Sequence, residues 1–121
     1  MEPAVSILIA TQGRVPQLER LLDSLVGLEN RAEIQHEILV ANNAQGKATA
    51  AAVEALLQKY RADEPERWIH VRESIPGKSR ALNRLLPLVK ANLLAFLDDD
   101  VEVAPESVSY THLTLPTILR V

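Results

Sequence analysis

Three carboxylates stand side by side in the sequence, Asp98, Asp99 and Asp100, directly after the apolar run 93–97. Adjacent carboxylates repel one another unless a cation relieves the repulsion. Successive side chains of an extended chain point to opposite faces, which predicts that Asp98 and Asp100 share a face and Asp99 points away. Carboxylate oxygens are ligands that suit Mg²⁺ and Mn²⁺. The spacing leaves two interpretations open, a divalent-metal site at Asp98 and Asp100 or a charged strand exit that binds no ligand.

Cationic side chains stand in a second polar segment, where Lys78 and Arg80 follow Gly77 at the start of a predicted helix. The first N–H groups of a helix and nearby cations can together bind a phosphate group. Asn83 lies about one helical turn further on and can fix the loop or contact a ligand. The alternative for these side chains is an ordinary solvated surface.

Polar side chains also follow the first two apolar runs of the chain. They are Thr11 and Arg14 after the first run, and Asn42 and Asn43 after the second. An asparagine amide carries both a donor and an acceptor, so it can recognise the edge of a base. Asparagine is also a common turn residue. Thr11 and Arg14 can likewise contact a nucleotide or cap the helix that follows.

The elements that must position these residues alternate along the chain. Short apolar runs predict strands, and apolar residues at helical spacing predict helices. The predicted strands are residues 5–10, 37–41, 68–71 and 93–97, and the predicted helices are residues 16–28, 47–61 and 79–89, with Pro87 expected to kink or end the last one. This alternation predicts an α/β fold, a Rossmann-like, mostly parallel sheet with flanking helices. Ligands of such sheets bind beyond the carboxyl ends of the strands, where all the polar segments above converge.

Length and composition exclude several classes of protein. The chain has 121 residues, which fits one domain, and 47% of them are hydrophobic, which is enough for a core. The net charge of -3 argues against a nucleic-acid partner, and the absence of cysteine excludes disulfides and thiolate metal sites. We find no secretory signal and no apolar run near the roughly 18 residues of a membrane helix. The sequence predicts a cytoplasmic chain without a membrane segment.

The end of the chain differs in character from the rest. Residues 109–117 mix strand-forming residues and carry no charge. They resemble the translated sequencing-adapter text that recurs at the ends of metagenomic reading frames. We therefore expect a domain over residues 1–108 and a non-native tail over residues 109–121. The alternative is an authentic edge strand.

Taken together, the motifs resemble family 2 glycosyltransferases of the GT-A fold. The resemblance covers about residues 4–108 and corresponds to the N-terminal, donor-binding half of that family. It rests on three segments: an opening strand with a Thr-x-x-Arg turn in residues 5–14, a Gly-Lys-x-x-Ala-Leu-Asn segment in residues 77–83, and a DXD motif in residues 96–101. Each segment is weakly specific alone, but their order and separation make the set fairly specific.

The resemblance implies transfer of a sugar from a nucleoside-diphosphate donor to an acceptor, with inversion and with Mg²⁺ or Mn²⁺. It implies that the opening turn and the end of the second strand hold the base, and that the aspartates hold ribose, phosphate and metal. The residues expected to bind donor are Thr11, Arg14, Asn42, Asn43, Lys78, Arg80, Asn83, Asp98 and Asp99, with metal at Asp98 and Asp100. The family often has aspartate where this chain has Asn42. We therefore expect a UDP-sugar as the donor, with GDP- and dTDP-sugars as alternatives.

The resemblance also implies that the acceptor site and the catalytic base lie beyond the DXD motif. Inverting transfer needs that base to remove the proton of the acceptor hydroxyl. We therefore expect this chain to bind donor without efficient turnover. The acceptor, a glycan, a lipid or another molecule, stays unidentified, and a site at the inner face of the membrane stays open for the full-length protein.

Three other interpretations compete with this one. A nucleotidyltransferase should have a glycine-rich loop after its first strand, where this chain has only Gly13. A receiver-type phosphoacceptor domain should have acidic residues there, and none follows Ala10 directly. The third alternative is a non-catalytic binding or interaction module.

Overall fold

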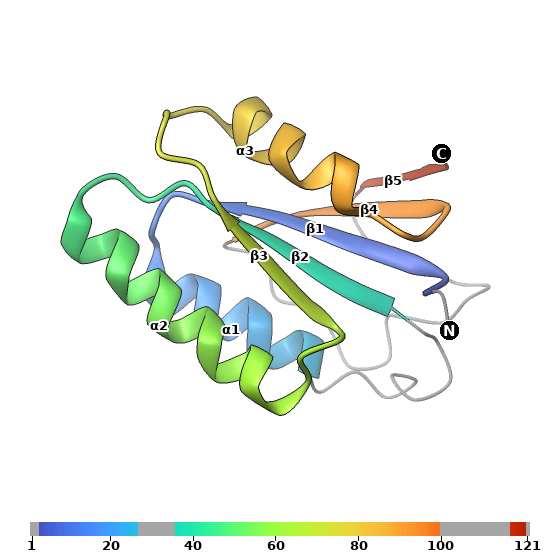
Figure 1. Ribbon diagram of the computed structural model, residues 1–121, viewed down its shortest axis with the longest axis horizontal. Helices are drawn as coiled ribbons and strands as arrows, with labels where there is room; N and C mark the ends of the chain where they lie inside the picture. The colour runs from blue at the N-terminus through green and yellow to red at the C-terminus, as the bar shows by residue number, and fades with distance from the viewer. Residues whose placement is uncertain (1–2, 27–35, 100–116, 121) are drawn as a thin grey trace.

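The computed structural model describes residues 3–26, 36–99 and 117–120. Strands and helices alternate in the predicted order (Figure 1). The elements are β1 (Val5–Thr11), α1 (Val15–Val26), β2 (His36–Asn42), α2 (Lys47–Asp63), β3 (Trp68–Arg72), α3 (Lys78–Leu85), the 3₁₀ turn η1 (Leu86–Leu88), β4 (Leu93–Asp98) and β5 (Thr117–Arg120).

The strands form one sheet in the order β3-β2-β1-β4-β5. β1 to β4 are parallel and β5 is antiparallel to β4, so the predicted mostly parallel sheet is confirmed. The register brings the strand ends level, because Thr11 pairs with Asn42 and Ala10 pairs with Asp98. Thr11, Asn42 and Asp98 are each the last residue of a strand, so the sheet fixes where their side chains point.

Helices cover both faces of the sheet. α1 and α2 lie on one face and α3 lies on the other (Figure 1). Leu18, Leu21, Leu22 and Leu25 of α1 are fully buried in the larger core, at the spacing of one helical face. A smaller core lies under α3. Because both faces are covered, β1 and β2 are buried almost throughout, and their middle residues are apolar, as in strands of a doubly covered parallel sheet.

The third helix is shorter than the sequence predicts. α3 ends at Leu85 and continues as the 3₁₀ turn η1, with Pro87 in its first turn. Proline has no N–H to donate to the preceding turn of an α-helix, but it fits the start of a new turn. The expectation that Pro87 kinks or ends this helix therefore agrees with the structure, whereas the predicted end at residue 89 is wrong and the helix starts one residue earlier than predicted.

The edge strand β5 falls within the segment expected to be a non-native tail. Residues 93–96 of β4 pair with it in antiparallel register. Backbone pairing of this kind needs no particular side chains, so the non-native origin of residues 109–121 stays a prediction. Residues 100–116, which include Asp100, lie outside the described part of the chain.

Candidate functional site

A cavity of about 220 Å³ opens at the carboxyl ends of β1 and β4. We call it the carboxyl-edge cavity. Its lining residues are Ala10, Gln12, Arg14, Asn43, Lys78, Asp98 and Asp99. Five of the residues that the sequence predicts for the donor site are among them, brought together from four separate segments.

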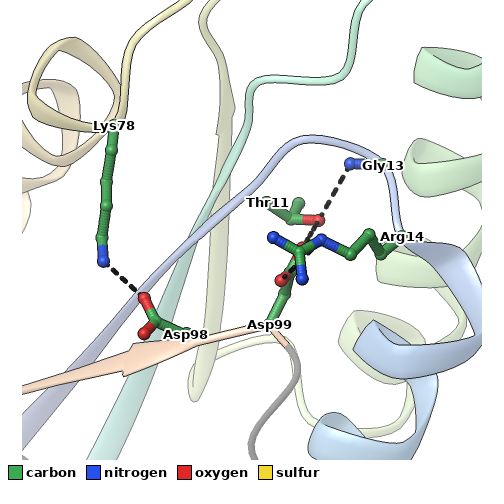
Figure 2. A network of polar contacts seen from close by, with 6 residues as sticks. All are labelled: Thr11, Gly13, Arg14, Lys78, Asp98 and Asp99. Atoms are coloured by element: carbon green, nitrogen blue, oxygen red, sulfur yellow. Dashed lines mark hydrogen bonds and ion pairs between the residues drawn. The ribbon is translucent and has the colours of Figure 1, made fainter.

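Asp98 ends β4 and faces the cavity with a side chain that is 59% exposed. Its carboxylate forms an ion pair with the ammonium group of Lys78, the first residue of α3 (Figure 2). α3 begins after Gly77, whose φ of +142° is a conformation that residues with a side chain rarely adopt. The end of β4 and the start of α3 thus bring a carboxylate and an ammonium group together over the cavity.

Asp99 points the other way and is held below the surface. Only 4% of it is exposed. Thr11 Oγ1 donates a hydrogen bond of 2.9 Å to its Oδ2, and Arg14 Nε lies 3.6 Å from its Oδ1 (Figure 2). Thr11 Oγ1 also accepts a hydrogen bond of 3.2 Å from the N–H of Gly13. The predicted divergence of the first two aspartates is therefore present, and Asp99 ties β4 to the turn after β1.

The predicted metal pair is represented here by Asp98 alone, because Asp100 lies outside the described residues. Within the described ranges, no group of three acidic or histidine side chains could hold a metal ion. Asp98 nevertheless fits such an ion, since its oxygens are hard ligands at an open cavity and a cationic group already lies against them. Metal binding by Asp98 and Asp100 stays a prediction.

Asn43 lines the cavity, but its amide serves the loop between β3 and α3. Its Nδ2 donates to the carbonyls of Glu73 (2.6 Å) and Ile75 (2.9 Å), and its Oδ1 accepts from the N–H of Gly77 (3.1 Å). Asn43 is 1% exposed. It therefore fixes the position at which α3, and with it Lys78, begins.

Asn42 is fully buried and does not line the cavity. Its Nδ2 donates to the carbonyl of Ala50 and to Oε2 of Glu54, both at 3.0 Å, and its Oδ1 accepts from the N–H of Ala44 at 3.2 Å. The structure gives Asn42 a role in holding α2 against the end of β2. A base could reach this amide only by replacing those bonds.

The other predicted residues lie around the cavity rather than in its wall. Thr11 is fully buried beneath Asp99. Arg80 and Asn83 are exposed on α3 and are not among the lining residues. Their predicted contacts with donor stay predictions.

Two positioning residues escape the sequence analysis. The guanidinium of Arg72 donates to the carbonyls of Asn42 (2.7 Å), Glu73 (2.8 Å) and Ala44 (2.8 Å). The side chain of Gln45 donates to the carbonyl of Asn43 at 3.0 Å. Arg72 ends β3 opposite Asn42, so a prediction that ran the third strand one residue further would have found it at the same sheet edge.

Comparison with known sequences shows the family of the chain. The sequence model of the family described as Glycosyl transferase family 2 matches residues 6–111. The beta-monoglucosyldiacylglycerol synthases of Trichormus variabilis and of a Nostoc species are each 29% identical over 104 residues, 86% of this chain. These residues are 22% of each relative, so the chain spans about a fifth of their length.

Comparison with solved structures shows the same fold. The mannosyltransferase PcManGT of Pyrobaculum calidifontis, in complex with GDP-Man and Mn²⁺, matches 84% of this chain and 29% of its own length, with a TM-score of 0.66 and 23% identity. S. aureus TarS 1–349 in complex with UDP matches 88% of this chain and 29% of its own, with a TM-score of 0.68 and 20% identity. Among the described residues, no helix is both long enough and apolar enough to span a membrane.

Proposed function

The chain belongs to glycosyl transferase family 2, and on this premise we propose that its carboxyl-edge cavity binds the nucleotide-sugar donor of a glycosyltransferase. The observation that carries the proposal is the pair Asp98 and Asp99 at the end of β4. One carboxylate is buried and fixed, and its neighbour is exposed to the cavity beside a cation. The observed sheet and helices match the solved structures above, as expected for the GT-A fold that the sequence resemblance implies.

The charges that line the cavity suit the leaving group of sugar transfer. When the bond to the anomeric carbon breaks, negative charge develops on a nucleoside diphosphate. Lys78 and Arg14 both line the cavity, and their N–H groups can bind phosphate oxygens. Mg²⁺ or Mn²⁺ held by Asp98 and Asp100 would supply a Lewis acid for that charge. Asp99, which Thr11 holds through a hydrogen bond, would keep Arg14 beside the diphosphate through their ion pair.

The base is proposed to lie on the side of the turn after β1, where Gln12 and Arg14 line the cavity. UDP-sugars are the favoured donors, with GDP- and dTDP-sugars as the other candidates. Support comes from the neighbours in fold, which were solved with GDP-Man or with UDP. Asn42 and Asn43 would support this part of the wall rather than recognise the base, because their amides are already bonded within the chain.

The activity of the whole protein is proposed as sugar transfer with inversion, in the cytoplasm. The two curated relatives are named for a glucosyldiacylglycerol, so a lipid acceptor at the inner face of the membrane is one candidate beside a glycan. We assign residues 1–108 to donor binding. The acceptor site and the catalytic base would lie in the part of the relatives that this chain does not span.

A thermal-shift titration with Mn²⁺ and UDP tests donor binding directly, with GDP and dTDP as parallel ligands. A ligand that binds only the folded state stabilises it by about 2.7 kcal/mol at a hundredfold excess over its dissociation constant. We expect Asp98→Ala to remove the Mn²⁺-dependent part of the shift. Asp63→Ala, which removes an exposed carboxylate at the end of α2, should keep it. If no diphosphate shifts the wild-type chain with Mn²⁺, the cavity does not bind donor and Asp98 is a charged strand exit without a ligand.

A further inference from the structure

The two aspartates of the carboxyl-edge cavity are held with very different firmness. Asp99 is 4% exposed, accepts a hydrogen bond from Thr11 and forms an ion pair with Arg14. Asp98 and Lys78 form their ion pair with side chains that are each 59% exposed. An ion pair so open to water contributes little to stability. The partner of Asp98 can therefore be exchanged without unfolding any element.

The side chain of Lys78 can change its partner while its backbone stays in place. Its backbone is fixed, because Asn43 accepts a hydrogen bond from the N–H of Gly77 directly before it. Its side chain is a flexible four-carbon stem that ends in a compact ammonium group with three donors. The ammonium can leave Asp98 and turn to another anion in the cavity while the start of α3 stays in place.

The formal charges of the cavity wall favour two ligands arriving together. Among the described residues that line the cavity, Arg14 and Lys78 balance Asp98 and Asp99. A divalent cation alone would add positive charge and would have to displace Lys78 from Asp98. A diphosphate alone would add negative charge beside two aspartates. A divalent metal and the doubly negative diphosphate of a nucleotide sugar together restore the balance, with the metal on Asp98 and the ammonium on the diphosphate.

We propose that Lys78 is a resident counter-ion of Asp98, which a divalent metal ion displaces and which a diphosphate group then binds. The proposal rests on the proposed function, donor binding at this cavity. Its consequence is that Lys78 couples the two ligands: each raises the affinity for the other, by the same factor. Metal without a diphosphate binds less tightly than it would if Lys78 did not compete with it for Asp98.

Mn²⁺ binding to the 121-residue chain, followed by electron paramagnetic resonance, tests this coupling. Titrations are made with Mn²⁺ alone and with Mn²⁺ in the presence of UDP, corrected for the Mn²⁺–UDP complex in solution. We expect Lys78→Met to bind Mn²⁺ alone about two- to fivefold more tightly than wild type, the range set by an exposed ion pair. The same variant should bind UDP alone more weakly, and UDP should raise its Mn²⁺ affinity by a smaller factor.

Arg84→Met is the matched control, because it removes the same charge from an exposed position of the same helix. Circular dichroism checks that each variant is folded, and Lys78→Gln serves as a second replacement. In an Asp98→Asn background, Lys78→Met should no longer change Mn²⁺ affinity. If Lys78→Met and Arg84→Met bind Mn²⁺ alone equally well, the counter-ion role is wrong while donor binding stands. If wild type binds UDP but no Mn²⁺, the counter-ion role is wrong while donor binding stands. If it binds none of UDP, GDP and dTDP, with or without Mn²⁺, donor binding itself is wrong, and the counter-ion role falls with it.

Discussion

At Gly13 the backbone has a φ of +109°, and a Cβ placed there would lie 2.4 Å from Cγ2 of Thr49 on α2. Non-glycine residues rarely adopt this conformation, and the contact is too short for the two atoms to coexist. Gly13 also donates the hydrogen bond that orients Thr11 toward Asp99. The approach of α2 to the turn after β1 therefore depends on the missing side chain at this position.

We expect Gly13→Ala to lower the free energy of unfolding by about 2–4 kcal/mol, from backbone strain and steric overlap together. Gly46→Ala separates the two causes, because Gly46 has a φ of +91° but nothing within 4 Å of its added Cβ. Urea unfolding of both variants gives the difference. Thr49→Ser, which removes the clashing methyl group, should recover part of the loss in the Gly13→Ala chain. Equal losses in the two glycine variants would contradict a steric role.

The role of Asn42 could not be decided from the sequence. An asparagine after a strand can turn to a ligand or back to the chain, and its neighbours in sequence do not decide between these. Here the deciding groups are Ala50 and Glu54, which α2 brings to the amide only after the helix has packed. Asp98 and Asp99 were easier, because the alternation of a strand fixes their directions before any packing is known.

At the scale of elements, the loop between β3 and α3 depends on Asn43. Three of its polar contacts go to Glu73, Ile75 and Gly77. We expect Asn43→Ala to cost about 1–3 kcal/mol of stability, because it leaves buried groups without their partners. Amide hydrogen exchange should rise in residues 73–78 and stay unchanged in β1. The affinity for UDP should fall as well, because Lys78 would lose its fixed start.

Gln45→Ala is the comparison variant for this loop, and it also removes the 3.0 Å hydrogen bond to the carbonyl of Asn43. Its side chain also reaches the loop, donating to the carbonyl of Ser74, but at 3.4 Å and in an exposed position. We expect a much smaller rise in exchange from this variant. If Asn43→Ala and Gln45→Ala behave alike, the loop is positioned by its own backbone rather than by Asn43.

The elements themselves were largely predictable. Apolar runs bounded by polar residues identified the four parallel strands, and Pro87 predicted where α3 stops. The role of Arg72 was not predictable, because its three carbonyl partners come together only when β2 and β3 lie in register. Sequence patterns predict strands and helices one at a time. The Arg72 guanidinium instead links the end of β3 to the segment after β2.

At the scale of the whole molecule, stability rests partly on a contact between α1 and α2. The hydroxyl of Tyr60 donates a hydrogen bond to Oδ1 of Asp23, and Tyr60 is 7% exposed. Burial raises the pKa of Tyr60, and the hydrogen bond and the negative charge of Asp23 raise this pKa further. The folded chain thus holds the phenol proton more tightly than the unfolded chain does, where the pKa is about 10.

The sign of the pH effect follows from this difference. The contribution of Tyr60 is complete below the unfolded pKa and is lost as the pH rises above it toward the folded pKa. Between pH 10 and 11 we expect the free energy of unfolding to fall by about 1 kcal/mol more in wild type than in Tyr60→Phe. Urea unfolding at several pH values measures both slopes. Parallel slopes would mean that the phenol has no stronger hold on its proton in the folded chain.

The different positions of Asp98 and Asp99 follow from where β4 ends, because Asp98 is its last residue and Asp99 is the first residue after it. Even and odd residues of a strand serve opposite sides, so the count of residues from Leu93 decides which aspartate is buried against Thr11 and which meets Lys78. One residue inserted into β4 would exchange these two environments while leaving the composition of the site unchanged. The chemistry of this edge therefore depends on the number of residues in β4 as well as on their types. We expect β4 to tolerate substitutions better than insertions or deletions.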